Sequence, residues 1–173
     1  WVDLHLIPSV RPAPLELLQR RRRAIIEVNR AVQDCRVVIM TLGLVELWFD
    51  ERQGRFLNST PIPRVFKQDP DRFSFRVLDF QECLDAMEGT VALLRRYCRS
   101  DQQLILTVSP VPMASTLRSD TDVMVANTYS KSLLRTVAEH IVLRHDHAHY
   151  FPSYESIVLS DRQLAWMDDL VHV

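Results

Sequence analysis

Apolar residues recur at two different spacings along the chain. Between Leu15 and Gln33 they follow a helical period, which predicts a helix, and the run Cys35–Leu42 is apolar and β-branched. Such a run is typical of a strand buried on both faces. The same two patterns then alternate toward the carboxyl terminus and predict a helix over about 79–98, a strand over 103–108, a helix over about 122–144, a strand over 149–151 and a short helix or turn from Asp161.

Residues 49–78 do not follow either pattern. Glycine, asparagine, three prolines and several charges interrupt this segment. The sequence predicts a long irregular connection, with a short strand over about 73–78. Long connections inside compact domains are often functional, so a lid or a substrate wall is expected here.

Helices that alternate with buried strands predict an α/β fold, a three-layer α/β/α sandwich around a parallel sheet. In such sheets, ligands bind at the carboxyl ends of the strands. Gly43, the segment 109–112 and the segment 150–155 each follow a predicted strand. The candidate site is therefore expected at this edge of the sheet.

The length of 173 residues suits one domain over 1–173. The 21 Lys and Arg nearly balance the 22 Asp and Glu, which argues against a nucleic-acid or anionic-membrane partner. The run Arg20–Arg23 lies in a predicted helix and is interpreted as a solvent-exposed face of that helix. Only three glycines are present, which excludes a phosphate-cradling loop or a dinucleotide fingerprint, and no cofactor is expected.

The three cysteines, Cys35, Cys83 and Cys98, are widely spaced in apolar stretches. This favours buried reduced thiols and a cytoplasmic location over a disulfide framework. No run is long enough for a membrane span, and no signal-peptide pattern is present.

Two acid–base candidates lie near the end of the chain. Asp169 and His172 are three residues apart, so on a turn or helix end their side chains face the same side. The carboxylate would hold the imidazole in one tautomer, and the imidazole would take a proton from a serine hydroxyl. The alternative is an ordinary surface Asp and His.

Other polar residues have simpler interpretations. Ser109 precedes a proline at a strand end and lacks the strained elbow of a serine nucleophile. The imidazoles of His145, His147 and His149 alternate along an extended segment and could chelate a metal. No further ligand stands at a recognisable spacing, so solvated histidines are expected and no metal is predicted.

Four blocks together give the chain a family resemblance: Thr41–Trp48, Thr107–Pro112, Tyr150–Glu155 and Asp169–His172. In this order and spacing they resemble the GSCFA family, a branch of the SGNH (GDSL-like) hydrolases. The resemblance implies a flavodoxin-like sandwich and a serine-type O-acyl ester hydrolase or acyltransferase, with an acetylated sugar or polysaccharide as substrate. It also implies that Asp169 and His172 belong to a catalytic triad.

The family's Gly-Ser-Cys-Phe-Ala block, which would carry the serine, does not occur in this sequence. It is expected before residue 1, so the chain is expected to lack its first strand, to be shortened at both termini and to be inactive as it stands.

The resemblance carries further residues over to this chain. Gly43 is the glycine of the Thr-Leu-Gly block, and its amide would donate to an oxyanion, although a packing glycine is an equal alternative. Asn58 matches a loop asparagine and is a second candidate donor, or else a turn residue. The pattern Asn127, Ser130 and Lys131 would line the site or, as the favoured alternative, pack the start of a helix.

One departure from the superfamily pattern keeps a second function open. Many SGNH hydrolases have a G-x-N-D block whose asparagine completes the oxyanion hole, whereas residues 43–46 here read Gly-Leu-Val-Glu. The alternative is a non-catalytic domain that kept the fold and binds a glycan or a partner protein.

Overall fold

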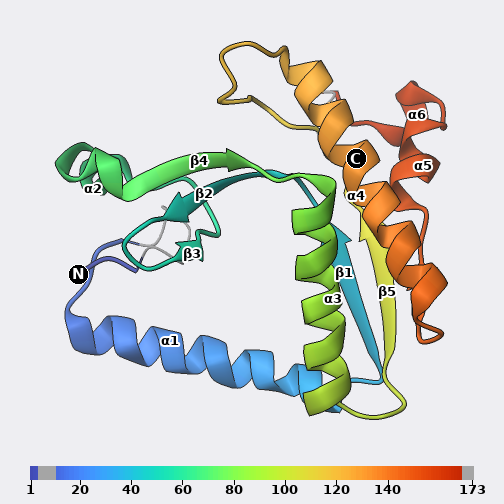
Figure 1. Ribbon diagram of the computed structural model, residues 1–173, viewed down its shortest axis with the longest axis horizontal. Coiled ribbons are helices and arrows are strands. Elements are labelled where there is room, and N and C mark those ends of the chain that lie inside the picture. The colour runs from blue at the N-terminus through green and yellow to red at the C-terminus, as the bar shows by residue number, and fades with distance from the viewer. Residues whose placement is uncertain (4–10, 169–173) are drawn as a thin grey trace. The chain divides into compact units, whose positions relative to one another are not determined.

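The computed structural model describes residues 1–3 and 11–168, in which the chain forms two compact units. One comprises Trp1–Ala31 and Glu46–Leu78, and the other comprises Val32–Val45 and Asp79–Val173. We call them the antiparallel unit and the parallel unit, after their sheets. Figure 1 labels their helices and strands.

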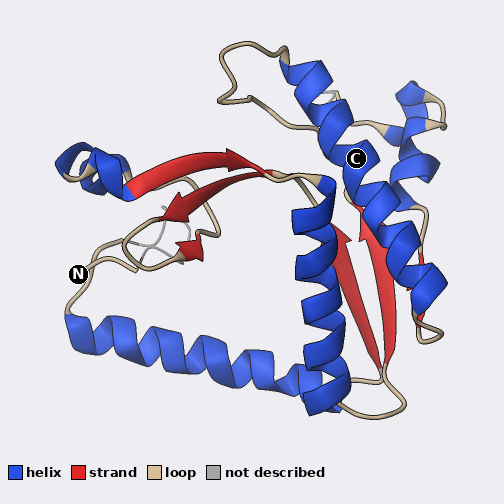
Figure 2. Cartoon of the chain, in the orientation of Figure 1, coloured by secondary structure: helices blue, strands red, loops and turns tan. Residues whose placement is uncertain are grey.

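The parallel unit is built on a three-stranded parallel sheet in the order β1-β5-β6. Its strands are β1 (Val37–Leu42), β5 (Gln103–Val108) and β6 (Ala148–Tyr150). The three strands predicted from the apolar runs are therefore confirmed, β5 with the predicted bounds. Figure 2 shows β1 and β5 running side by side in the same direction.

Local signals set the helices of this unit. Asp79 and Glu82 form the capping box of α3, with Glu82 N donating to Asp79 Oδ1 at 2.8 Å and Asp79 N to Glu82 Oε2 at 2.9 Å. Asp122 caps the next helix by accepting from Met124 N at 2.8 Å. The helices are α3 (Phe80–Tyr97), α4 (Val123–Arg144), α5 (Ser153–Val158) and α6 (Arg162–Ala165).

The core of the parallel unit lies on one face of the sheet. Helix α4 packs on β5 and β6, and α3 packs beside α4. Leu106, Val108, Val137 and Ile141 are completely buried there. On the other face, α5 packs on β5. The predicted α/β fold, with a parallel sheet flanked by helices, is confirmed.

Strand β1 differs from its prediction. Its residues alternate between exposed and more buried positions, with Val37 48% and Ile39 67% exposed. The prediction of burial on both faces is wrong, because an apolar run alone does not show which faces its neighbours cover.

The antiparallel unit corrects the prediction of an irregular connection over residues 49–78. It holds a three-stranded antiparallel sheet in the order β3-β2-β4, with only the last strand predicted. Its elements are α1 (Leu15–Arg30), β2 (Glu46–Asp50), β3 (Arg55–Phe56), α2 (Pro63–Gln68) and β4 (Phe73–Val77); short 3₁₀ turns span Ala31–Asp34 and Pro70–Arg72.

The residues that suggested irregularity have local roles in this sheet. Pro63 and Pro70 stand in the first turns of helical segments, where a missing N–H costs nothing. Gly54 has a φ of 62° in the turn between β2 and β3. Cross-strand aromatic contacts such as Trp48 with Phe75, at 5.8 Å between ring centroids, stabilise the pairing.

Three smaller findings complete the fold. All three cysteines are free, but Cys35 is exposed, so its predicted burial is wrong. Arg20, Arg22 and Arg23 are exposed on α1, as expected of a solvated face. Among the helices of the described residues, none combines the length and the apolar character needed to cross a bilayer.

Candidate functional site

The carboxyl ends of the three parallel strands meet at one edge of the sheet, and the predicted blocks follow them. Gly43 comes directly after β1, Ser109 after β5 and Phe151 after β6. Ser109 N donates to Leu42 O at 2.8 Å, and Phe151 N donates to Leu106 O at 2.8 Å. The structure thus brings these blocks together at the expected edge.

Gly43 offers a free backbone donor at this edge. Within residues 1–3 and 11–168, its N–H donates no hydrogen bond, and the residue is only half-buried. A Cβ built on Gly43 would meet no other atom within 4 Å. Packing therefore does not require a glycine here, since a side chain at this position would meet no neighbour.

The carbonyl group of Gly43 accepts a hydrogen bond from a buried lysine. Lys131 on α4 is 1% exposed, and its Nζ donates to Gly43 O at 3.1 Å. The adjacent Ser130, completely buried, accepts from Val45 N at 3.5 Å through its hydroxyl oxygen. Two neighbouring side chains of one helix thus hold the loop that follows β1.

Burial lowers the pKa of Lys131 from 10.5 to about 8. The carbonyl of Gly43 is its acceptor, and the described part of the chain gives it no carboxylate partner. A buried amine with a pKa near neutrality is a common feature of functional sites.

The loop after β5 is held from the same helix. Asn127 Oδ1 accepts from Met113 N at 3.0 Å. Asn127, Ser130 and Lys131 stand at i, i+3 and i+4, so they share one face of α4. The favoured interpretation, packing at the helix start, missed their contacts with the loops of the candidate site. A lysine at a position where the helix pattern calls for an apolar residue is the signal that could have found them.

Ser109 lies at the edge without the partner of a nucleophile. Its Oγ accepts from Val111 N at 3.3 Å, and no imidazole of the described residues bonds to it. It forms a local turn after β5, which agrees with its assignment as a structural residue.

The segment after β6 forms a bonded cluster. Tyr150 Oη donates to Glu155 Oε2 at 2.8 Å, and Arg135 Nε donates to Glu155 Oε1 at 3.0 Å. Burial, and then the Glu155 carboxylate, raise the pKa of Tyr150 far above its usual range. Glu155 is half-buried, and its ion pair with the Arg135 guanidinium joins the segment after β6 to α4.

A comparison with protein families relates the sequence of this chain to a known group. The model of the GSCFA family matches residues 5–173. The chain belongs to the GSCFA family. A search of the curated proteins found no match, and a search of the solved structures found none either.

Three further residues were assigned to the site from the GSCFA pattern. Asp169 and His172 lie outside the described residues, so their roles stay predictions. Asn58 belongs to the antiparallel unit, where it is exposed at a bend after β3. Its role as an oxyanion donor also stays a prediction.

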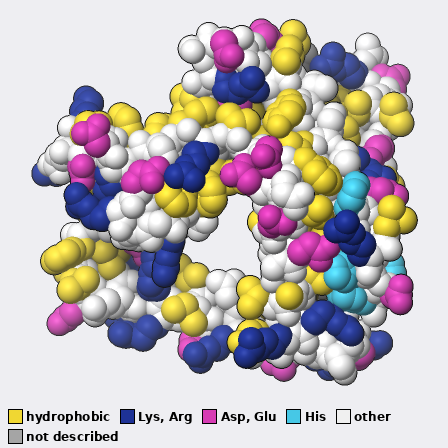
Figure 3. Space-filling model, viewed as in Figure 1, with side chains coloured by type: hydrophobic (Ala, Val, Ile, Leu, Met, Phe, Trp, Pro, Cys, Tyr) yellow, Lys and Arg dark blue, Asp and Glu magenta, His cyan; other side chains and the backbone are white. Residues whose placement is uncertain are grey.

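The histidines of this GSCFA chain have other contacts. His145 Nε2 lies 2.8 Å from Glu88 Oε2, and His149 Nε2 lies 2.8 Å from Gln103 Oε1. No cluster of three or more His, Cys, Asp or Glu side chains suited to a metal ion occurs in the described ranges. Figure 3 shows histidine side chains reaching the surface between α3 and α4.

Proposed function

We propose that this GSCFA domain is a serine-type O-acyl ester hydrolase or acyltransferase of the SGNH kind, formed by residues 1–173 as one domain and acting on acetylated carbohydrate. Membership of the family supports a hydrolase-like α/β protein. The observation that carries the proposal is the Gly43 amide, whose N–H has no acceptor among the described residues, while Lys131 holds the carbonyl of the same residue.

The chemistry assigns one step to each residue. Asp169 orients the imidazole of His172, which takes the proton of a serine hydroxyl as the serine oxygen attacks the ester carbonyl. The resulting oxyanion accepts a hydrogen bond from the Gly43 N–H. His172 then protonates the leaving alcohol, and an acyl-serine remains.

The second half of the reaction decides between hydrolase and acyltransferase. Water or an acceptor hydroxyl attacks the acyl-serine, His172 takes its proton, and the serine oxygen recovers a proton when the intermediate collapses. The serine is assigned to the Gly-Ser-Cys-Phe-Ala block of the family, which the printed sequence does not contain. The enzyme to be tested is therefore the protein that includes this block.

In this scheme Lys131 is a positioning residue. Its hydrogen bond to Gly43 O holds the peptide plane that follows Gly43, and the bond from Val45 N to Ser130 holds the next turn of the loop. The peptide plane that contains the Gly43 N–H is held by Ser109 N, which donates to Leu42 O at 2.8 Å. A donor that is fixed before the reaction stabilises the oxyanion without reorganisation, which is the main source of its catalytic effect.

The test is the release of acetate from acetylated oligosaccharides by the protein with its Gly-Ser-Cys-Phe-Ala block. Asp169→Asn is expected to lower kcat by about 10³-fold to 10⁴-fold, because the imidazole loses its orienting carboxylate. Asp168→Asn, the adjacent exposed aspartate, is the matched control and should retain full activity. Equal activity of the two variants would refute the assigned role of Asp169.

The departure from G-x-N-D at residues 43–46 favours one alternative, a glycan-binding domain without catalysis. Such a domain would bind acetylated oligosaccharides in a calorimetric titration and release no acetate from them. Turnover that depends on Asp169 would exclude it.

A further inference from the structure

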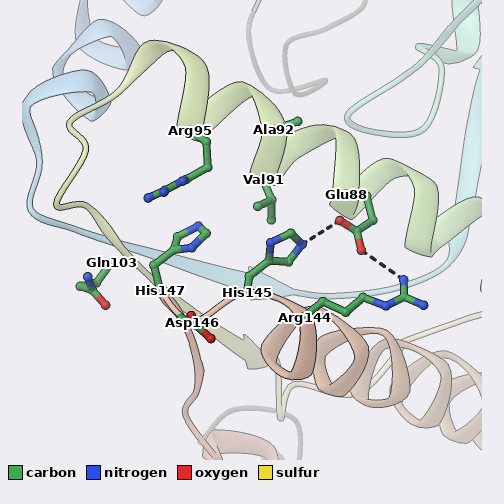
Figure 4. A pocket seen from close by; sticks show the side chains of 9 residues that line it. All are labelled: Glu88, Val91, Ala92, Arg95, Gln103, Arg144, His145, Asp146 and His147. Carbon is green, nitrogen blue, oxygen red and sulfur yellow. Dashed lines mark hydrogen bonds and ion pairs between the residues drawn. The ribbon is translucent and has the colours of Figure 1, made fainter.

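A cavity lies at the opposite, amino-terminal edge of the parallel sheet. Its volume is about 500 Å³, and it is lined by α3, the end of α4 and the segment that leads into β6. Figure 4 shows its side chains, among them Glu88, Arg95, Gln103, Arg144, His145 and His147. Because Gln103 begins β5, the cavity is separated from the candidate acyl-transfer site by the length of the strands.

One polar atom in this cavity is buried without a partner. His147 Nε2 is inaccessible to solvent and forms no hydrogen bond with the residues that the structure describes. A buried polar group left in this state is destabilising, because it lost its bonds to water and gained none in the protein. Burial lowers the pKa of the His147 imidazole, and the surrounding positive charges, Arg95 first among them, lower it further.

Arg95 supplies an uncompensated positive charge beside this imidazole. Figure 4 shows its side chain extending from α3 toward His147. Its Nη1 donates to Ser100 O at 3.3 Å, and it takes part in none of the ion pairs formed within residues 1–3 and 11–168.

The other charged groups of the cavity wall neutralise one another. Arg144 Nη1 lies 3.2 Å from Glu88 Oε1, and His145 Nε2 lies 2.8 Å from the other oxygen of the same carboxylate. Asp146 is exposed, and in Figure 4 its carboxylate points away from Arg95. The free donors of the cavity are thus concentrated at Arg95 and His147.

We propose that this cavity binds an oxyanion, a phosphate or carboxylate group of a small molecule, at the guanidinium of Arg95 and beside the imidazole of His147. A planar guanidinium presents paired donors that match such oxygens, and the charge of Arg95 is not neutralised by any carboxylate of the described residues. A cation is disfavoured by the positive charge already gathered around His147. This site is independent of the acyl-transfer proposal.

The test follows the imidazole of His147 by nuclear magnetic resonance at pH 6 while inorganic phosphate or acetate is added. Chloride at equal ionic strength measures simple screening. A saturable shift with phosphate alone, with acetate alone or with both supports the site and identifies the oxyanion that it accepts. Shifts no larger than those with chloride would overturn the proposal. His147→Gln assigns the resonance.

Two neighbouring arginines of α3 make the matched pair of variants. Arg95→Gln should weaken anion binding about tenfold or more, because a charge-assisted hydrogen bond is lost. Arg96→Gln removes an exposed guanidinium that lies 5.1 Å from the Tyr97 ring centroid and outside the cavity lining. It should leave binding unchanged, and equal weakening by both substitutions would overturn the site.

Discussion

Among the residues that the structure describes, each compact unit buries one charged side chain, and the two have very different hydrogen-bond partners. In the antiparallel unit, Asp50 is completely buried and accepts from Arg72 Nε at 2.9 Å and Arg72 Nη2 at 2.5 Å. The backbone N–H groups of Arg52 and Gln53 add two further bonds. In the parallel unit, Lys131 is 1% exposed and has one carbonyl as its acceptor.

The pKa values move in accordance with these surroundings. Hydrogen bonding to Arg72 lowers the pKa of Asp50, so its charge is stabilised by the fold. Burial lowers the pKa of Lys131 to about 8, so its charge is opposed by the fold. A buried charge with every bond satisfied serves structure, whereas one that the fold disfavours is the better candidate for a functional group.

The largest effect is expected when the paired charge is broken. Asp50→Ala leaves the guanidinium of Arg72 buried without its partner and should lower the free energy of unfolding by about 3–5 kcal/mol, measured by urea denaturation. Glu51→Ala, which removes an exposed partner of Arg76, should have a much smaller effect. If both variants lose the same stability, Asp50 is not the structural charge described here.

The pairing of Asp50 with Arg72 also predicts that the protein loses stability at acid pH. Because the folded pKa of Asp50 is lowered, its contribution is fully present above the ordinary value of 3.8 and is lost as the pH falls through the folded pKa. Asp50→Ala should therefore flatten this part of the stability curve.

Lys131 should show the opposite pH dependence. Its pKa is about 8 in the folded protein and 10.5 in the unfolded one, so the unfolded chain binds more protons between these values and stability rises with pH there. At about 1.4 kcal/mol for each pKa unit, the rise is at most about 3–4 kcal/mol. Lys131→Met should abolish it.

The chain supplies its own control, because Lys67 on α2 is exposed. Lys67→Met should keep the rise in stability between pH 8 and 10.5. A wild-type curve that stays flat over this interval would mean that the Lys131 ammonium is not disfavoured by burial, and the contrast with Asp50 would be lost.

Substitution of Gly43 is expected to have the smallest effect on stability. It therefore tests the catalytic role of the amide separately from side-chain packing. An added Cβ meets nothing within 4 Å, so Gly43→Ala should change the free energy of unfolding by less than about 1 kcal/mol. If an ester carbonyl approaches its amide, the methyl group should nevertheless lower turnover about tenfold to a hundredfold.

Gly89 is the matched control for this substitution. It lies within α3, and a Cβ built there also meets nothing within 4 Å. Gly89→Ala should stabilise the protein by about 1 kcal/mol through helix propensity and leave turnover unchanged. Unchanged turnover in Gly43→Ala as well would remove Gly43 from the oxyanion site.

The sequence predicted those parts of the fold that rest on local signals. The capping box of Asp79 and Glu82 set the start of α3, and the apolar run 103–108 set β5. The order of helices and strands was enough to predict the common edge where Gly43 lies. The parallel strands follow from the same order, since each connection between them is long enough for a crossover.

Other features depend on contacts between distant residues and could not be predicted in this way. The pairing of β2 with β4 rests on side-chain contacts such as Trp48 with Phe75, which are absent from any local pattern. Lys131 stands where the helix pattern calls for an apolar residue, but its contact with Gly43 exists only once α4 packs on the sheet. Burial created by tertiary packing was the missing information.

The central claim is acyl transfer at the carboxyl edge of the sheet by a histidine-activated serine. The most direct measurement is the kcat for p-nitrophenyl acetate of the protein with its Gly-Ser-Cys-Phe-Ala block, with His172→Ala and His149→Ala beside it. His149 is exposed and bonds to Gln103 at the start of β5, so it controls for the loss of an imidazole. We predict a loss of several orders of magnitude in His172→Ala and none in His149→Ala. Equal turnover in His172→Ala and the wild type would contradict the claim.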